Sequence, residues 1–410
     1  MAAIMAARAN GRIVRVLRPG AERGDGRLAM MPRPPAPRLS LLGGQTPATF
    51  LRRYWQKDAL LVRGAVPDFN GLHTRAQLFA LAARDDVEAR LLVRSGRAWS
   101  LEHGPFSARV LRTLPATDWT LLVQGANLES DAADALLRRF SFLPFARLDD
   151  LMVSYAAPGG GVGPHFDSYD VFLLQGFGRR RWRYGRQQDL ALRPDLPVKI
   201  LRRFVPEHDA VLAPGDMLYL PPAYAHDGVA VDACTTYSIG FRAASHQELA
   251  EAFFDWIRDH VEIPGRYEDP DARPTGEPAR IDAGMVKKAT AALDRARWNR
   301  SMVAQFLGTM LSEPKGHVVF TAPVAPLSRA RFDAALRKHG VQLDRRTQWL
   351  YDDEAIYLNG NAHAWPGGDR DALMQLANVR ALTTAQSALL PAGARVFLHQ
   401  AHNDGYVHAH

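Results

Sequence analysis

The chain has little cysteine and no long apolar run. Its 410 residues include a single cysteine, Cys234, which excludes an internal disulfide and any cysteine-rich zinc module. No stretch of about 18 consecutive apolar residues occurs, so we expect no membrane span. A reducing compartment suits such a composition, and we therefore expect a cytoplasmic location.

Acidic residues are scarce at the amino terminus. Residues 1–40 hold eight arginines but only Glu22 and Asp25 as acids, so they carry +6 of the formal net charge of +8. The basic pI near 9.7 therefore comes mainly from this N-terminal tail, and we do not expect the remaining residues to bind nucleic acid directly. This tail is rich in Pro, Arg, Ala and Gly, and we expect it to be disordered, with Met30 or Met31 as the natural start.

Strand signals dominate the middle of the chain. The chain is long enough for two or three domains, and with 47% apolar residues it can form a hydrophobic core in each. A helix is expected after the N-cap pair Thr46-Pro47, and a short strand at Leu60–Val62. Further short strands, separated by Gly and Pro turns, are expected at 151–155, 165–175, 179–184, 217–220 and 235–241. Such spacing is typical of a β-sandwich or barrel.

A helical pattern follows Arg242. Ser245-His-Gln-Glu248 predicts a capping box, and further helices are expected at about 282–297 and 300–311. Their apolar faces need a partner, either the barrel or a second subunit.

The last hundred residues predict a small α+β unit. We expect a helix over 328–339 ended by Gly340, a hairpin near 352–354, helices at 370–379 and 384–390, and a final hairpin turned at 403–405. Helices followed by a terminal β ribbon look like a winged helix.

His165, Asp167 and His226 are the candidate metal ligands. Residues i and i+2 of a strand point to the same face, so His165 and Asp167 can hold one ion. His226 follows a turn, an apolar strand and the pair Pro221-Pro222, and it is expected just past that strand. Two histidines and one carboxylate suit Fe(II) oxygenase chemistry, because three positions stay open. An isolated H-x-D triplet is weak evidence, so the interpretation depends also on the glycine-rich approach at 159–164.

The strand after the metal residues supplies a candidate cation. Alternation over Arg179–Arg183 allows two inward faces, one with three arginines and one with Arg180 and Trp182. A barrel interior accepts one paired cation more easily than three unpaired ones. We therefore expect Arg180 to face inward, where its guanidinium fits the distal carboxylate of a bidentate 2-oxo acid. Tyr169 and Asp170 follow the metal pair and are candidates for the substrate mouth, or are merely structural.

These motifs are similar to those of a known family. They include Tyr54-Trp-Gln-Lys57, His103-Gly-Pro-Phe106, Leu148-Asp-Asp-Leu-Met152, Pro158-Gly-Gly-Gly-Val-Gly-Pro-His165, Gly178-Arg-Arg-Arg-Trp-Arg183 and Gly240-Phe-Arg242. Together they resemble JmjC-type 2-oxoglutarate oxygenases, and specifically the bacterial ribosomal oxygenases that hydroxylate an arginine of the sixteenth large-subunit ribosomal protein. Ala223 departs from the pattern, because related barrels often place a glycine in the turn before the distal histidine.

The resemblance implies a fold and a set of roles. The fold would be mainly β: a double-stranded β-helix of the cupin/JmjC type over 41–244, a helical dimerisation segment over 245–312 and a winged-helix-like α+β domain over 313–410. His165, Asp167 and His226 would hold Fe(II), Arg180 would pair with 2-oxoglutarate, and Ser154 would help to bind it. O2 would be the oxidant, a ribosomal protein the substrate and a homodimer the assembly.

Two alternatives stay open from the sequence. The first is hydroxylation of a ribosomal-protein histidine by the same chemistry. The second is a non-catalytic cupin-like metal sensor with a DNA-binding winged helix, which the basic helix predicted over 328–339 does not exclude. A sensor, however, has no need for an inward Arg180 beside an intact iron triad.

Overall fold

The computed structural model describes residues 38–368 and 370–409. The predicted disordered tail over 1–40 lies almost entirely outside these residues. None of the helices that the structure describes has the length and apolar character needed to cross a membrane.

The first part of the chain is mainly β-structure. Its strands are β1 (Leu60–Val62), β2 (Ala89–Ser95), β3 (Ala98–His103), β4 (Trp119–Val123), β5 (Leu148–Ala156), β6 (Val171–Gln175), β7 (Arg180–Arg186), β8 (His208–Leu212), β9 (Met217–Leu220), β10 (Tyr224–Ala230) and β11 (Cys234–Phe241). Its helices are the 3₁₀ turns η1 (Ser40–Leu42) and η2 (Phe145–Arg147), and α1 (Pro47–Arg53), α2 (Arg75–Ala82), α3 (Ala108–Arg112), α4 (Ala126–Glu129) and α5 (Asp131–Arg138).

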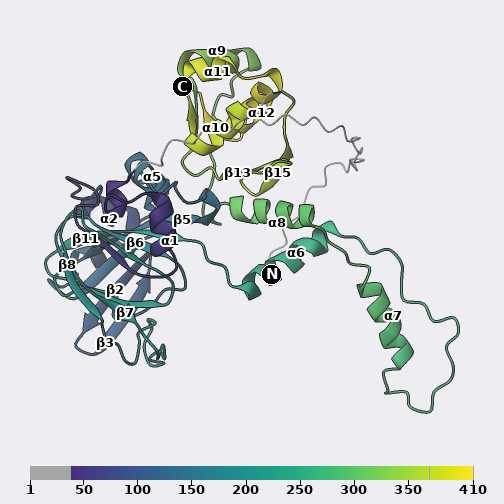
Figure 1. Ribbon diagram of the computed structural model, residues 1–410, viewed down its shortest axis with the longest axis horizontal. Coiled ribbons are helices and arrows are strands. Elements are labelled where there is room, and N and C mark those ends of the chain that lie inside the picture. The colour runs from purple at the N-terminus through teal and green to yellow at the C-terminus, as the bar shows by residue number, and fades with distance from the viewer. Residues whose placement is uncertain (1–37, 369, 410) are drawn as a thin grey trace. The chain divides into compact units, whose positions relative to one another are not determined.

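These strands form two sheets, visible on the left of Figure 1. The larger has eight strands in the order β1-β9-β6-β11-β5-β4-β2-β3, and the smaller has three in the order β10-β7-β8. Every pairing is antiparallel. Side chains from both sheets, among them Leu173 and Trp182, share one apolar cluster, so the sheets face each other. This is the double-stranded β-helix expected for a JmjC domain.

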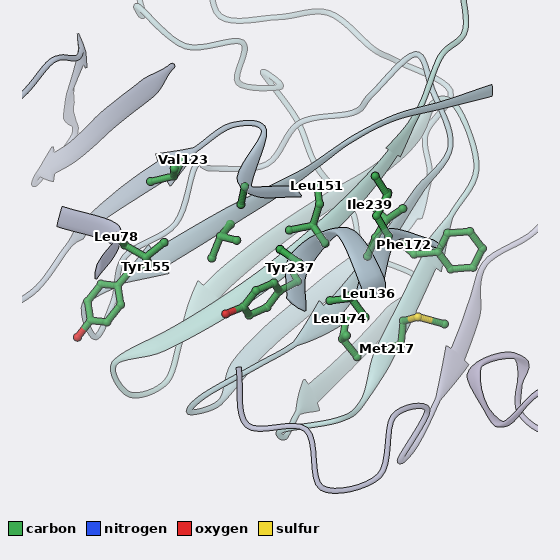
Figure 2. Packing of buried hydrophobic residues seen from close by; sticks show 14 of the residues in the cluster. Leu78, Val123, Leu136, Leu151, Tyr155, Phe172, Leu174, Met217, Tyr237 and Ile239 are labelled. Carbon is green, nitrogen blue, oxygen red and sulfur yellow. The ribbon is translucent and has the colours of Figure 1, made fainter. Parts of the chain in front are cut away.

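The outer face of the larger sheet carries the main core. Figure 2 shows Val123, Leu151, Phe172 and other side chains that project from this face. Leu78 of α2 and Leu136 of α5 are buried in the same cluster, so these helices cover the outer face. Each such side chain stabilises the fold by about 1.5–3 kcal/mol when it leaves water.

The inner face of the larger sheet is partly polar. Because successive residues of a strand alternate, the strands that send apolar side chains outward also place Thr120, Ser154, Gln175 and Thr236 inward, and all four are buried. A purely structural core has little use for so many hydroxyl and amide groups. The space between the sheets is therefore suited to a polar ligand.

A helical stretch follows the sheets. It contains α6 (His246–His260), α7 (Ala283–Leu293) and α8 (Arg300–Ser312). The predicted capping box is confirmed, because Glu248 N–H donates to Ser245 Oγ and Ser245 N–H donates to the Glu248 carboxylate. Neither α6 nor α7 has a fully buried residue, whereas Phe306 of α8 is buried.

The C-terminal part is a separate α+β unit with its own core. It consists of α9 (Arg329–His339), β12 (Val341–Leu343), β13 (Trp349–Tyr351), β14 (Ala355–Leu358), β15 (Asn361–Ala364), α10 (Asp371–Val379), β16 (Ala381–Leu382), α11 (Thr384–Ala388), α12 (Ala392–Asn403) and β17 (Val407–His408). The helix ended by Gly340 and the hairpin near 352–354 are confirmed. Helix α8 packs on this hairpin, because a side chain at Gly308 would meet the ring of Tyr357.

Two predicted elements need correction. The hairpin at 403–405 is wrong: Asn403 ends α12, which buries Ala394, Leu398 and Ala401 at helical spacing, and β17 pairs with β12 instead. The strand predicted over 165–175 begins only at Val171. His165 and Asp167 therefore lie in the irregular segment before β6, where one backbone bridge between His165 and His226 replaces a regular ladder.

Candidate metal centre

Three side chains converge at one end of the space between the sheets. One ligand atom from each of His165, Asp167 and His226 lies within 4.8 Å of the others. The backbone fixes this arrangement, because His165 N–H donates to His226 O at 3.0 Å and His226 N–H donates back at 2.8 Å. His226 lies within β10, and the Asp167 carbonyl accepts from Ala223 N–H at 2.8 Å.

The imidazole rings are oriented by carbonyl groups. His165 Nδ1 lies 2.9 Å from Gly163 O, and His226 Nδ1 lies 3.0 Å from Tyr224 O. A carbonyl only accepts, so each Nδ1 carries the proton and each Nε2 keeps a free lone pair. His226 Nε2 lies 3.7 Å from Asp167 Oδ2, a separation that one ion bound to both can bridge. This is the ligand orientation found in metal sites.

Electrostatics favour the neutral imidazole. The pKa of His226 is lowered to about 4, chiefly by burial and also by nearby His165, while Asp167 acts in the opposite sense. A neutral ring is the form that coordinates a metal. Nitrogen and carboxylate oxygen donors without cysteine suit iron, and three ligands leave coordination positions for other molecules.

Two backbone details explain motifs around the ligands. A side chain at Gly161 would lie 2.5 Å from Gly228 O, so only glycine lets the approach segment pass β10 this closely. Ala223 has φ of 61°, which is a left-handed conformation. The departure from glycine at this turn therefore leaves the turn geometry intact at the cost of backbone strain.

Arg180 lies inside, as predicted from alternation. It is 4% exposed, and neither Nε nor Nη2 has a hydrogen-bond partner among the described residues. Its guanidinium carbon is 5.7 Å from the Trp182 ring centre. The flanking arginines point outward and pair with carboxylates, in the pairs Arg179–Asp232, Arg181–Asp209 and Arg183–Asp227.

The free guanidinium lies within reach of the ligands. Arg180 pairs with Ala230 of β10, and His226 is four residues earlier on the same face. This separation is about 13 Å along the strand, which an arginine side chain and a five-carbon dicarboxylate can span together. A buried cation without a partner is costly, so the site fits an anionic ligand.

Ser154 also lies in this space. It is 3% exposed, and its hydroxyl donates a long bond of 3.5 Å to Thr236 O. Such a weak bond leaves the hydroxyl available to a ligand carboxylate.

Tyr169 and Asp170 have different environments. Tyr169 is 40% exposed, and the pKa of its phenol is raised by burial and then by Asp167 and Asp150. The placement of Asp170 at the substrate mouth is wrong, because its carboxylate is fully buried and accepts from Tyr219 Oη at 2.6 Å and Gln56 Nε2 at 3.0 Å. Its partner Tyr219 belongs to the outer core, whereas the next residue, Val171, faces the space between the sheets, so alternation turns Asp170 away from the iron ligands.

The support around Asp170 was missed from the sequence. Arg147 Nη2 lies 3.7 Å from this carboxylate, and Gln56 N–H donates to Tyr219 Oη at 2.8 Å. The only available signal was the Tyr54-Trp-Gln-Lys57 motif, which gave no contact. Asp170 thus joins the metal-bearing segment to the N-terminal helix region.

The fold and the site define a class. Two histidines and a carboxylate lie between the sheets of a double-stranded β-helix, beside a buried arginine whose Nε and Nη2 have no partner in the described part of the chain. This is the arrangement of an Fe(II)- and 2-oxoglutarate-dependent oxygenase. Comparison with known proteins agrees: residues 135–249 match the JmjC domain, and residues 295–407 match the ROXA-like winged helix.

Individual relatives extend the match to most of the chain. The ribosomal protein uL16 3-hydroxylase of Escherichia coli is 35% identical over 341 residues, which are 82% of this chain and 89% of the relative. Human ribosomal oxygenase 1 is 29% identical over 47% of this chain and 32% of its own length. The crystal structure of E. coli YcfD has a TM-score of 0.77 at 32% identity, covering 88% of this chain and 97% of that one.

The chain belongs to the JmjC-type ribosomal oxygenase family. Another structure of E. coli YcfD, with cobalt and 2-oxoglutarate, has a TM-score of 0.74 at 31% identity, with 88% of this chain and 97% of that chain covered. The protein is thus a 2-oxoglutarate-dependent dioxygenase with a C-terminal winged helix, and the non-catalytic sensor is excluded as its class.

Proposed function

We propose that the protein hydroxylates an arginine side chain of a large-subunit ribosomal protein, uL16. The observation that carries the oxygenase chemistry is the His165, Asp167 and His226 set beside the buried guanidinium of Arg180, whose Nε and Nη2 have no partner within residues 38–368 and 370–409. The choice of substrate rests on the similarity to the E. coli enzyme over most of both chains.

Each site residue has a defined task. His165, Asp167 and His226 would hold Fe(II), which together with 2-oxoglutarate and O2 supplies the oxidising power to hydroxylate an unactivated C–H bond. Arg180 would pair with the distal carboxylate of 2-oxoglutarate through two parallel hydrogen bonds, and Ser154 would donate a further one. The polar interior fixes the co-substrate, while the apolar rings of Trp182 and Tyr184 restrict water.

The surroundings of Tyr169 support a cationic substrate side chain. Asp149 and Asp150 lie close enough to raise the pKa of this phenol, while Arg90 opposes them. Both carboxylates are already paired with Lys315, so a substrate guanidinium would bind chiefly by stacking on the exposed ring. Tyr169 is therefore the proposed substrate contact.

The proposed substrate also bears on the location of the protein. A ribosomal protein as substrate favours a cytoplasmic location.

Product mapping tests this function. The protein is incubated with Fe(II), 2-oxoglutarate, O2 and purified uL16, and succinate and a gain of one oxygen are measured, with fragmentation to locate the modified residue. Hydroxylation on arginine that is abolished in Asp167→Ala supports the proposal. Hydroxylation on histidine, or undiminished activity in Asp167→Ala, would contradict it.

We further propose that α6 and α7 assemble a homodimer. Several large apolar side chains of this stretch are exposed: Phe254 (59%), Met285 (45%), Val286 (52%), Leu293 (72%) and Trp298 (50%). Neither helix buries a residue in the single chain, so a second copy is the partner that would cover them. Light scattering should give twice the chain mass, and Leu293→Asp should reduce it to one chain mass if this surface is the interface.

A further inference from the structure

Strand β3 forms one edge of the larger sheet. Its six residues pair with β2 on one side, and no strand of residues 38–368 or 370–409 pairs with the other side. The strand contains no proline, and its pairing with β2 runs in register without a bulge. Natural proteins usually protect such edges, because an unpaired row of N–H and C=O groups binds other extended chains.

Two hydrogen bonds determine which groups of β3 are open. Gly104 N–H donates to Ala89 O, and Arg94 N–H donates to Asp118 O on the β4 side. Antiparallel pairs alternate between bonded and non-bonded residues, so Leu91 and Val93 of β2 bond to β3 while Arg94 does not. It follows that Ala98, Ser100 and Glu102 direct their backbone groups to β2. The outward backbone groups belong to Trp99, Leu101 and His103.

The same alternation directs side chains to the iron site. Trp99 and Leu101 lie opposite Arg94 and Leu92, and they are half-buried on the inner face of the sheet. A Cβ placed on Gly163 would lie 3.4 Å from Trp99 Cζ2, so the indole rests on the backbone two residues before His165. The open edge therefore runs beside the segment that carries the first metal ligand.

We propose that β3 is the docking strand for the substrate polypeptide, which adds to it as a further strand. This proposal rests on the proposed function, in which the substrate is a protein that must present one side chain at a fixed depth. Only an extended polypeptide matches an alternating row of backbone donors and acceptors. Pairing with the backbone of β3 would place alternate substrate side chains on the inner face, toward Tyr169 and the metal ligands.

Amide-resolved hydrogen exchange tests this docking mode. In the free protein, the outward amides of Trp99, Leu101 and His103 should exchange rapidly, whereas those of Ser100 and Glu102 should be protected by β2. Addition of uL16 with Fe(II) and 2-oxoglutarate in the absence of O2 should slow the outward set about tenfold or more. The proposal would be overturned if the outward amides gained no protection on addition of uL16. It would also be overturned if these amides already exchanged slowly in the free protein, because the edge would then be covered before the substrate binds.

A backbone substitution gives an independent readout. Leu101→Pro removes an outward N–H at a position where proline is tolerated, while Leu101→Ala shortens the side chain and keeps the N–H. The KM for uL16 should be about fivefold higher in the proline variant than in the alanine variant, which corresponds to one lost hydrogen bond. The affinity for 2-oxoglutarate, measured by calorimetry, reports whether the fold of each variant is intact.

The possible results separate the two proposals. Equal KM values in two folded variants would overturn docking on β3, even where uL16 is hydroxylated. Failure to hydroxylate uL16, combined with slowed exchange of the outward amides on its addition, would contradict the proposed reaction and leave the docking surface in place. Should Leu101→Pro not fold, the exchange experiment on the unmodified protein decides the question.

Discussion

Replacement of Arg180 by methionine should have opposite effects on stability and on co-substrate binding. The guanidinium is 4% exposed, and its Nε and Nη2 have no partner among the described residues. The ligand-free protein therefore keeps a charge in a poorly solvated interior, and an apolar side chain of similar length removes that cost. We expect Arg180→Met to raise the free energy of unfolding by about 1–4 kcal/mol.

The same change should nearly abolish 2-oxoglutarate binding. Removing one partner of a buried, hydrogen-bonded charge pair costs about 2–5 kcal/mol. At about 1.4 kcal/mol for each factor of ten, the Kd should rise roughly 30-fold to 4,000-fold. Calorimetric titration with Co(II) and 2-oxoglutarate measures the Kd, and urea unfolding without ligand measures the stability.

Arg181→Met is the matched control. Arg181 is the next residue of β7, but its side chain is exposed and paired with Asp209. A surface ion pair contributes about 0–1 kcal/mol, so both the stability and the Kd should change little. If Arg180→Met destabilised the ligand-free protein and left the Kd unchanged, the interpretation of this arginine as a co-substrate anchor would be refuted.

Four further outcomes are expected. Asp167→Ala should lower metal affinity at least about tenfold in a Co(II) titration, because one of three ligands is lost, and unchanged affinity would contradict the site. Asp170→Ala should cost about 3 kcal/mol in urea unfolding, since Tyr219 Oη and Gln56 Nε2 lose their acceptor; a cost below about 1 kcal/mol would show that the network is not structural. Ala223→Gly should stabilise the protein by up to about 1 kcal/mol, because φ of 61° suits glycine. The pKa of His226 is lowered from 6.5 to about 4, so the free energy of unfolding of the metal-free protein should be greatest above pH 6.5 and fall by up to about 3 kcal/mol as the pH falls toward 4. Unfolding curves in EDTA at several pH values measure this dependence, and it should be weaker in His226→Gln.

The site was more predictable from the sequence than its surroundings. Residue spacing and alternation are local properties, so His165, Asp167, His226 and Arg180 could be singled out before any contact was known, and the structure brings all four into the space between the sheets. The burial of Asp170 depends on Tyr219, which is 49 residues away, and on Gln56, which is 114 away. Local patterns carry no information on such distant partners.

The secondary structure was likewise predicted only in part from the sequence. Five strands of the middle region were expected from their composition and turns, whereas β2, β3, β4, β8 and β10 were not predicted, although β4 has a strand-like composition. The final hairpin was predicted from the turn residues at 403–405, which also suit the end of a helix. For this segment, the helical spacing of Ala394, Leu398 and Ala401 would have predicted the structure correctly.

The ion pairs of Arg179, Arg181 and Arg183 on the outer side of β7 have a consequence for how this strand is aligned. A shift of this strand by one residue would turn Arg179, Arg181 and Arg183 into the interior and carry Arg180 to the surface. The exposed pairs with Asp232 and Asp209 contribute little energy, whereas the Asp227 carboxylate is only 5% exposed and depends on Arg183 for a partner. A shifted strand would lose all three pairs and bury three charges at once. The three ion pairs thus favour a single register of β7. A one-residue insertion in the turn before this strand should therefore be absorbed within the turn, leaving Arg180 in the interior and 2-oxoglutarate binding little changed.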